Sequence, residues 1–507
     1  MRIRGIHMPN PDYISLNPDQ IVKVGVNAWR AAVAERVGFM VDGAAYFTAL
    51  DEALRQARRT IWIVGWDFNP DIYLRPDRPS ETLGELLRSL VESNDDLEIR
   101  ILVWAMGPIY SGKSLALFSE NSWSAHPRIH LRFDRRHAIR GSHHQKFVTI
   151  DDQLAFIGGI DLTHKRWDDP RHDPDNPLRV TPSGETYEPV HDLQAALSGS
   201  AAAMIGDLAR RRWQHANGED ISPAPIDSTD AVWPGSVSDD FGGCEVALAR
   251  TEPGIRGRRS RREAMRLTMD ALASARDSIY IETQYLASFE VGRLLAKRLA
   301  EPDGPEVVVI VTRLSHGFLE KIMMGANRDR LIRRLKRADR HGRFRALYPV
   351  VPNRRGGECD ILVHAKLVVV DDRFIRLGSS NLNNRSEGLD TESDIAIEAE
   401  NGACKGAILS LRDRLMAEHL DCSEQDVRAA VTRRASLIGA IEELNTKPRG
   451  LRILAVDVEK GQTGPVFGTG MVDPRKPFTP IKGARRLWDA LTGRLTSLVA
   501  PQARKDM

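Results

Sequence analysis

Two stretches of this sequence repeat one arrangement of a histidine, a lysine and an aspartate. The first reads HQKFVTID and the second reads HAKLVVVD, so both have the form HxKxxxxD. The residues are His144, Lys146 and Asp151 in the first copy, and His364, Lys366 and Asp371 in the second. Because alternate residues of a strand point to the same face, each histidine should share a face with its lysine. Each aspartate falls at the strand end, where we expect it to brace a turn or hold the motif rather than touch a substrate.

Two histidines and two lysines that meet in space can cleave a phosphodiester. One neutral histidine can attack phosphorus and form a phosphohistidine. The other, when protonated, can donate its proton to the leaving alkoxide and then activate water. The lysines can supply the positive charge around the phosphoryl oxygens that a metal ion would otherwise provide. The motifs therefore predict a phosphoric diester hydrolase that needs no metal and no cofactor.

The two motifs belong to an internal duplication. His144 and His364 are 220 residues apart. A second pair of similar segments, 49–68 and 267–286, begins 218 residues apart, and each reads as a helix followed by a strand. Two separate landmarks at nearly one offset indicate a duplicated domain rather than two chance matches. We therefore expect one active site assembled from both halves.

Strand-like and helical patterns alternate in both halves. Apolar runs such as LEIRILVWA and PEVVVIVT are flanked by stretches with helical spacing. This alternation predicts two similar α/β domains, each with a mixed or largely parallel sheet flanked by helices. The expected boundaries are 1–26 for an N-terminal extension, 27–217 for the first domain, 218–243 for a Pro-, Gly-, Ser- and Asp-rich linker, 244–430 for the second domain, and 431–507 for a C-terminal tail.

Composition argues against several other classes of protein. The 507 residues carry a net charge of only +3, which argues against a nucleic-acid coat protein. None of the four cysteines has CxxC spacing, and the histidines other than His143, His144, His191 and His364 show no ligand spacing, so we expect no metal site and place those other histidines at the surface. The chain has no run of about 18 apolar residues, so no membrane-spanning helix is expected. Because no apolar secretion signal is visible, we expect a cytoplasmic or peripheral membrane protein, with leaderless export left open.

Five further segments, taken with the two motifs, resemble the phospholipase D superfamily, and more specifically its eukaryotic-type branch. They are IWIVGWDFNPDIYLRPD (61–77), GGIDLTHKRWDD (158–169), VHDLQAALSGSAA (190–202), IYIETQYL (279–286) and GSSNLNNRSEGLDTESDIAI (378–397). The resemblance covers roughly residues 27–425. It implies two similar α/β domains packed about a pseudo-twofold axis, with the active site at their interface.

The resemblance also implies roles for single residues. His144 would be the nucleophile that forms the phosphohistidine, and His364 would be the general acid and base. Ser379 and Asn381 would help to hold the phosphate, and Asp161 takes the place of Asn381 in the first copy.

Two carboxylates are implied to orient the histidine rings, and the resemblance assigns this role to Asp192 and Asp394. The second acidic element reads Glu392, Ser393, Asp394 where the family has Asp-Ser-Glu, so Glu392 stays open as the alternative to Asp394. Val190 stands where the family has a tryptophan before His-Asp, which changes one packing or lipid-side contact.

The function that these features favour is a phospholipase D, which hydrolyses glycerophospholipids to phosphatidate and the headgroup alcohol and can transfer the phosphatidyl group to alcohols. The expected partner is phospholipid at a membrane surface, met by a monomer that carries both half-sites. A cardiolipin synthase-like phosphatidyltransferase and a nuclease of the same superfamily are the alternative enzymes, although the small net charge argues against nucleic acid. A catalytically inactive membrane-binding or scaffold protein is a fourth reading, and two intact motifs argue against it.

Overall fold

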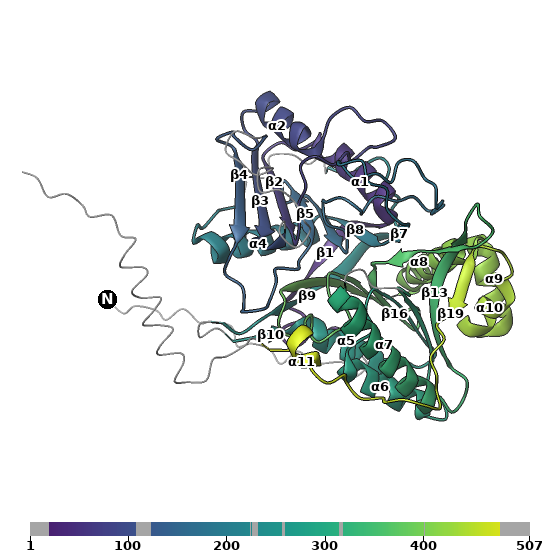
Figure 1. Ribbon diagram of the computed structural model, residues 1–507. Coiled ribbons are helices and arrows are strands. Elements are labelled where there is room, and N and C mark those ends of the chain that lie inside the picture. Colours follow the sequence, from purple (N-terminus) through teal and green to yellow (C-terminus); the bar gives the residue numbers. More distant parts are fainter. Residues whose placement is uncertain are drawn as a thin grey trace, which may run out of the picture.

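The computed structural model describes residues 20–107, 123–223, 225, 232–255, 259–313, 318–399 and 401–476. In Figure 1 the first half of the chain forms the upper lobe, in purple and blue, and the second half forms the lower lobe, in teal and green.

The first half is built on one mixed sheet. Its strand order is β4 (Ile129–Asp134), β3 (Glu98–Trp104), β2 (Thr60–Gly65), β5 (Phe147–Ile150), β6 (Leu154–Gly158), β8 (Leu193–Ser198) and β1 (Arg30–Val41). The first three strands run parallel, and every later neighbour is antiparallel. The first motif therefore lies on β5, next to the parallel strands.

The second half repeats this sheet strand for strand. Its order is β13 (Phe344–Pro352), β12 (Glu306–Val311), β11 (Ser278–Thr283), β16 (Lys366–Val370), β17 (Phe374–Gly378), β18 (Glu392–Glu398) and β9 (Phe241–Glu252). The directions are the same as in the first half. The duplication read from the sequence is therefore a duplication of structure.

Helices cover both faces of each sheet. They are α1 (Asp42–Leu54), α2 (Leu83–Ser93) and α4 (Ser200–Asn217) in the first half, and α5 (Glu263–Ser274), α6 (Phe289–Ala300), α7 (Phe318–Ala338) and α8 (Gly402–Leu420) in the second. Strand β2 shows why both faces need a cover. Ile61 and Ile63 share a core with α1 and α2, whereas Trp62 and Val64 lie in the core that includes α4 and α8. That second core runs through both halves.

The two sheets join through their last strands. Strand β1 pairs antiparallel with β9, with Ala34 opposite Cys244 and Val37 opposite Phe241. Because β1 and β9 are corresponding strands, an antiparallel pair between them is the arrangement that a twofold axis produces. A short parallel pair, β7 (Val190–His191) with β15 (Leu362–Val363), makes a second link between the halves. The prediction of two α/β domains about a pseudo-twofold axis is confirmed.

Each motif aspartate begins a tight turn. Asp151 and Asp152 both have positive φ, 53° and 54°, and the Gln153 amide donates to the Ile150 carbonyl at 3.0 Å. Ile150 pairs with Leu154, so a three-residue loop joins β5 to β6, and its first two positions lie in left-handed backbone, which favours Gly, Asn or Asp. Asp371 and Asp372 form the same turn between β16 and β17.

The motif aspartates hold the backbone of a neighbouring strand. The Asp151 carboxylate accepts the amide protons of Arg58, Arg59 and Thr60 at 2.8, 2.8 and 2.7 Å, just where β2 begins. Asp371 does the same for residues 276–278, at the start of β11. Their carboxylates brace the sheet, as the sequence suggested, and are committed to the backbone rather than to a substrate.

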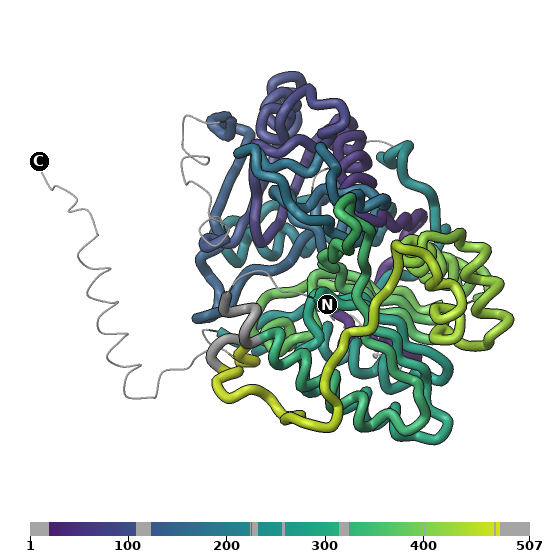
Figure 2. Tube along the Cα trace, turned by 45° about the vertical axis from the view of Figure 1, so that its right-hand side comes forward, coloured from purple at the N-terminus to yellow at the C-terminus, as the bar shows by residue number. Residues whose placement is uncertain are grey.

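The C-terminal boundary at 430 is wrong. Strand β19 (Gly450–Ile453) pairs antiparallel with β13, after α9 (Glu424–Arg434) and α10 (Leu437–Leu444), so it belongs to the second sheet. Beyond it the chain, yellow in Figure 2, crosses the second half, where Arg337 of α7 donates to the Val458 carbonyl at 2.7 Å. The weak apolar pattern of this segment hid these tertiary contacts. The segment ARRLWDALTGRL (484–495), whose apolar spacing predicts an amphipathic helix, lies outside the described residues.

The N-terminal extension also reaches into the fold. Ile21 and Val22 are buried in the core of the second half, and the Glu398 side chain accepts their amide protons. The described part of residues 1–26 thus packs as a component of the second lobe.

Replacing Asp151 should destabilise the chain without impairing chemistry. Asn tolerates the positive φ but has one acceptor oxygen, so Asp151→Asn leaves at least one of three amides unpaired and should cost about 1–3 kcal/mol. Urea unfolding would measure the loss. Asp421→Asn is the matched control, because Asp421 also has positive φ, 52°, but is exposed at the end of α8. Equal losses in both variants, or lost activity per folded molecule, would contradict the bracing role.

Candidate active site

The backbone of each motif histidine is hydrogen-bonded to a segment from the other half of the chain. The His364 amide donates to the His191 carbonyl at 2.7 Å, continuing the β7–β15 pair. In the same way the His144 amide donates to the Thr391 carbonyl at 3.0 Å, and Thr391 donates to Ser142 at 3.0 Å. These two strand-like contacts bring both motifs to the interface between the halves.

The histidine side chains exchange partners across this interface. His144 Nδ1 lies 2.9 Å from Glu392 Oε2, and His364 Nδ1 lies 2.6 Å from Asp192 Oδ2. In each pair the histidine comes from one half and the carboxylate from the other. An ionised carboxylate here accepts the Nδ1 proton, which fixes the ring and leaves Nε2 for chemistry. Neither histidine can be oriented in this way without the other half of the chain.

Sheet register identifies the acid that corresponds to Asp192. Gly158 stands opposite Gln194, and Gly378 stands opposite Asp394. Two residues before each partner lie Asp192 and Glu392, which are therefore equivalent. Asp394 instead pairs with Arg376 at 3.1 Å. Of the two acids that the sequence left open, Glu392 is therefore the one that contacts His144 and corresponds to Asp192.

Both lysines are buried beside their histidines. Lys146 Nζ donates to the His144 carbonyl at 2.9 Å and lies 3.3 Å from Asp161 Oδ2. Lys366 Nζ lies 3.0 Å from His364 Nδ1. Burial lowers the pKa of Lys366 to about 7, despite the nearby charge of Asp192. The site thus concentrates positive charge where water is largely excluded, which suits an incoming phosphate.

The two histidine–carboxylate pairs differ electrostatically. Burial, together with the neighbouring lysine charge, lowers the pKa of both His144 and His364 well below the usual value. Burial raises the pKa of Glu392 to about 8. Burial acts in the same direction on Asp192, but the charges of His364 and Lys366 outweigh it and lower that pKa. Because an ionised carboxylate stabilises an imidazolium more than a neutral carboxyl does, the arrangement favours His364 as the protonated histidine.

The residues expected to hold the phosphate have different surroundings. The Ser379 hydroxyl donates to Glu392 at 2.5 Å and accepts the Ser393 amide proton at 3.0 Å, so it contacts a carboxylate, and its expected contact with the phosphate stays a prediction. Asn381 is buried, and among the described residues its side-chain oxygen has no hydrogen-bond partner. Asp161 pairs with Lys146. Asn381 therefore remains the candidate for a substrate contact.

Sequence reasoning missed an arginine and several buried histidines. The charge of Arg166 adds to burial and to the lysine charges in lowering the pKa of His364 and Lys366, so it lies near the site. His172 and His419 are fully buried, so the expectation that they lie at the surface is wrong. These residues lie singly in loops or at helix ends, so no periodic pattern in the sequence could have revealed that they are buried.

A cavity of about 330 Å³ adjoins the segment that follows Asp161. Thr163, His164 and Lys165 form one wall. Most of the remaining lining is apolar or aromatic, as in Tyr73, Trp167, Leu178 and Val180. Such a lining suits a hydrocarbon chain better than a nucleotide.

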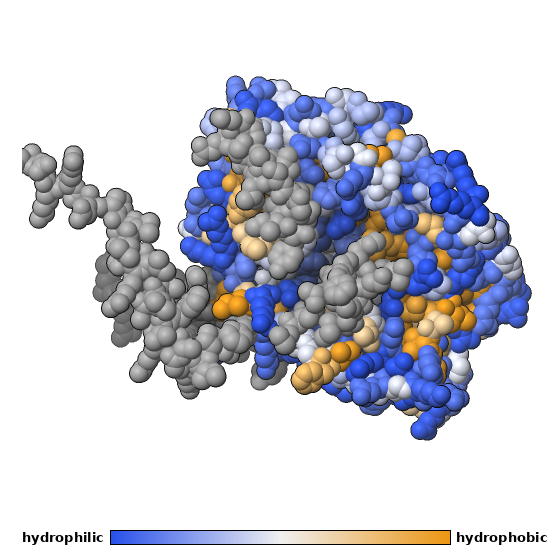
Figure 3. Space-filling model, in the orientation of Figure 1, coloured by the Kyte–Doolittle hydropathy of each residue, from blue (hydrophilic) through white to orange (hydrophobic). Residues whose placement is uncertain are grey.

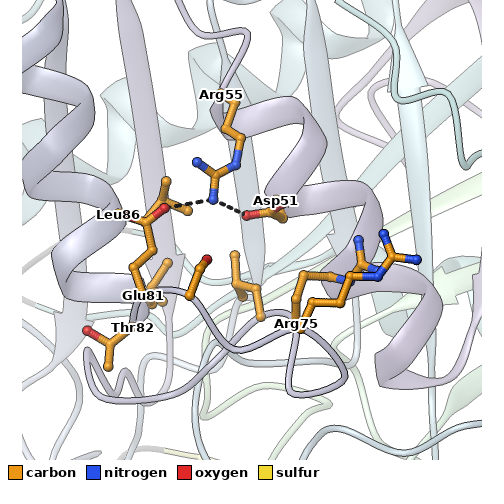
Figure 4. Close-up of a pocket in the computed structure, with 10 residues that line it drawn as sticks. Asp51, Arg55, Arg75, Glu81, Thr82 and Leu86 are labelled. Carbon is orange, nitrogen blue, oxygen red and sulfur yellow. Dashed lines mark hydrogen bonds and ion pairs between the residues drawn. The ribbon is translucent and has the colours of Figure 1, made fainter.

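A second pocket, between α1 and the residues before α2, is built from ion pairs in its own wall (Figure 4). Arg55 contacts Asp51 at 2.9 Å and Glu81 at 2.8 Å, so the charge of this arginine is already paired within the pocket wall. No residue of either motif lines it.

Two copies of one α/β domain build this site, and its histidines, lysines and carboxylates are groups of the kind that phosphodiester chemistry uses. Comparison with known families agrees. Residues 53–237 match the family model described as Phospholipase D, and residues 268–407 match the one described as Cardiolipin synthase, PLD-like domain. This chain belongs to the phospholipase D superfamily and carries two of its domains.

Curated relatives are distant and longer. Phospholipase D1 of Saccharomyces cerevisiae is 25% identical over 76% of this chain and 29% of the relative. Phospholipase D A of Dictyostelium discoideum is 24% identical over 76% and 35%, and Phospholipase D alpha 1 of Vigna unguiculata is 24% identical over 73% and 63%. The chain therefore spans less than two thirds of the length of each.

Among solved structures, phosphatidylserine synthase of Haemophilus influenzae Rd KW20 shares the fold, with a TM-score of 0.54. It is 15% identical, and the match covers 82% of this chain and 96% of that protein.

The raised pKa of Glu392 should make stability depend on pH. At a pH below the pKa that Glu392 has in the unfolded chain, this carboxyl contributes its full stabilisation to the folded state. That stabilisation is lost as the pH rises through about 8, because the folded chain retains a proton that the unfolded chain has already released. The ionisable groups facing Glu392 are His144, Lys146, Lys366, Arg385 and Asp394. These neighbours are present in both the native chain and the variant Glu392→Gln, so the effect of their titration on stability cancels when the two proteins are compared.

Between about pH 7 and about pH 8.5, the native free energy of unfolding should fall by up to about 1.4 kcal/mol per pH unit more than that of Glu392→Gln. Urea unfolding at each pH would measure it. Parallel pH profiles for the two proteins would show that Glu392 is already ionised in the folded chain.

Proposed function

We propose that this protein is a phospholipase D, which cleaves the distal phosphodiester of a glycerophospholipid and releases phosphatidate and the headgroup alcohol. The observation that carries the proposal is the crossed pairing of two histidines with two carboxylates, beside two buried lysines. This set supplies a nucleophile, an acid and the charge for a phosphoryl group within one site.

His144 attacks phosphorus through Nε2, and His364 gives its proton to the leaving headgroup oxygen, so the P–O bond breaks as the N–P bond forms. Phosphatidyl-histidine and a free alcohol result. His364, now neutral, takes a proton from water, whose oxygen attacks phosphorus. The N–P bond then breaks, phosphatidate leaves, and both histidines return to their starting states. The lysines hold the phosphoryl oxygens throughout.

A lipid substrate is supported by the apolar cavity and by the names of the relatives. The cavity offers space for hydrocarbon, and its residues Thr163, His164 and Lys165 follow Asp161 closely in the chain. None of the described helices is both long and apolar enough to cross a bilayer. On the face shown in Figure 3 the surface is mostly hydrophilic, with apolar residues in separate patches. Substrate is therefore met at the membrane surface.

Phosphatidyl transfer is the second candidate. The second half matches a domain described as that of cardiolipin synthase. An alcohol that takes the place of water in the second step would give transfer with no other change in the site.

Vesicles of mixed phospholipids would test the proposal, with lipids analysed by mass spectrometry. Phosphatidate and free headgroup should appear, and an added primary alcohol should divert part of the product to a phosphatidyl alcohol. Samples of single-stranded and duplex DNA would be incubated with the protein in parallel, to test for nuclease activity. Cleavage of DNA with intact lipids would replace the proposal by a nuclease.

The two histidines should differ towards an activated phosphodiester. Such a substrate needs no proton on its leaving group, so His364→Asn should still form a covalent adduct, which persists because water is not activated. His144→Asn should form none. On phospholipid, His364→Asn should be slower by about 10²–10⁴-fold.

Intact-mass measurement would detect the adduct, with His130→Asn on β4 as the matched control that keeps native turnover. An adduct on His144→Asn and none on His364→Asn would reverse the two roles.

A further inference from the structure

Four side chains converge in a buried cluster directly behind Asp192. They are Asp42 at the start of α1, His172 in the loop before β7, His191 on β7, and Glu418 near the end of α8. The first three are fully buried, and Glu418 is 9% exposed. One nitrogen or oxygen atom from each lies within 4.8 Å of all the others.

The spacing of these atoms is that of ligands around a small cation. His191 Nδ1 lies 3.0 Å from Asp42 Oδ1 and 3.1 Å from Glu418 Oε1. His172 Nε2 lies 3.1 Å from Glu418 Oε1 and 3.4 Å from Asp42 Oδ2. Tetrahedral ligands about 2.0–2.1 Å from Zn²⁺ are separated by about 3.3–3.4 Å.

Hydrogen bonds within the cluster do not account for Asp42. Neither of its carboxylate oxygens has a hydrogen-bond partner among the described residues, and the same is true of His191 Nδ1. Its contacts with His191 and His172 have ion-pair distances but no hydrogen-bond geometry, and a buried carboxylate in such surroundings is stabilised by a charged partner or by a metal ion. The unpartnered atoms are those that face the centre of the cluster.

The far nitrogen of each histidine is held by a further carboxylate. His191 Nε2 lies 2.8 Å from Glu282, and His172 Nδ1 lies 2.8 Å from Asp168. Glu282 in turn accepts hydrogen bonds from Tyr280 at 2.6 Å and His419 at 3.0 Å. Metal-bound histidines usually donate their other ring proton to a carboxylate, which fixes the tautomer that offers a lone pair to the metal.

We propose that Asp42, His172, His191 and Glu418 bind one structural divalent transition-metal ion, with Zn²⁺ the best match to two imidazoles and two carboxylates. Ca²⁺ fits less well, because it requires six to eight oxygen ligands. Four protein ligands close the site, so the ion takes no part in the chemistry at phosphorus. The sequence predicted no metal, because these ligands lie on four separate segments.

The ion would stabilise the contact between the two halves that positions the pair Asp192 and His364. Three ligands come from the first half and Glu418 from the second. His191 precedes Asp192, and its carbonyl accepts the His364 amide proton at 2.7 Å. Binding at this point would hold the β7–β15 contact, and with it the position of Asp192 against His364.

Metal analysis of the full chain would test the site without any substrate, so the result is independent of the proposed phospholipase activity. After expression with Zn²⁺ and dialysis against metal-free buffer, the native protein should retain about one ion per chain, measured by inductively coupled plasma mass spectrometry. Asp42→Asn and His172→Asn should retain less than about a tenth of this, and Asp168→Asn should bind about 10–100-fold more weakly. Both ligand positions have positive φ, 66° and 51°, which Asn tolerates.

Asp421→Asn is the control, since it makes the same kind of change at a positive φ outside the cluster, and it should keep the ion. The native chain stripped of metal should melt at a temperature that rises with the Zn²⁺ concentration, and Co²⁺ should give the strong visible bands of a four-coordinate ion. Native protein that holds no ion and shows no such shift in melting temperature would overturn the proposal. The four side chains would then be held together by hydrogen bonds and ion pairs with protonated histidines. Equal metal content in native and ligand variants would overturn it as well.

Discussion

The structure depends on an exchange of carboxylates between two copies of one domain. Each catalytic histidine needs an acceptor at Nδ1, and in both cases that acceptor belongs to the other copy: Glu392 serves His144 and Asp192 serves His364. A single copy would leave its histidine without the carboxylate that orients the ring. The crossed pairs therefore need both copies, and the β1–β9 pairing joins the two copies.

The exchange also makes two similar half-sites unequal. One pair uses the shorter Asp192, whose neighbour is Gly159, where a Cβ would lie 2.1 Å from the carboxylate. The other uses Glu392, whose carboxylate is contacted by the hydroxyl of Ser379, the residue that corresponds to Gly159. At Asp192 the charges of His364 and Lys366 together outweigh burial and lower the pKa, whereas at Glu392 burial prevails and raises it. A symmetric scaffold thus gives the two histidines carboxylate partners whose pKa values shift in opposite directions, a difference that suits a reaction with a nucleophile and a separate acid.

Positioning reaches well beyond the residues that could touch substrate. Asp151 and Asp371 belong to the motifs, yet they bind backbone amides at the start of β2 and β11 and so hold β5 and β16 against them. Behind Asp192, the buried cluster around His191 ties α1 to α8 across the interface. The chemistry is carried by few side chains, and most of the polar burial in this region serves to keep them in register.

The sequence alone determined the duplication, the α/β class and the two His–Lys pairs, because these depend on local spacing and on repetition along the chain. It left Glu392 and Asp394 as alternatives, since that choice depends on which residue of β18 lies opposite Gly378, a fact of sheet register. The role of Ser379, the strand β19 beyond residue 430, and the burial of His172 depended on contacts between distant segments. Such contacts leave no periodic pattern in the sequence, so only the tertiary structure could decide them.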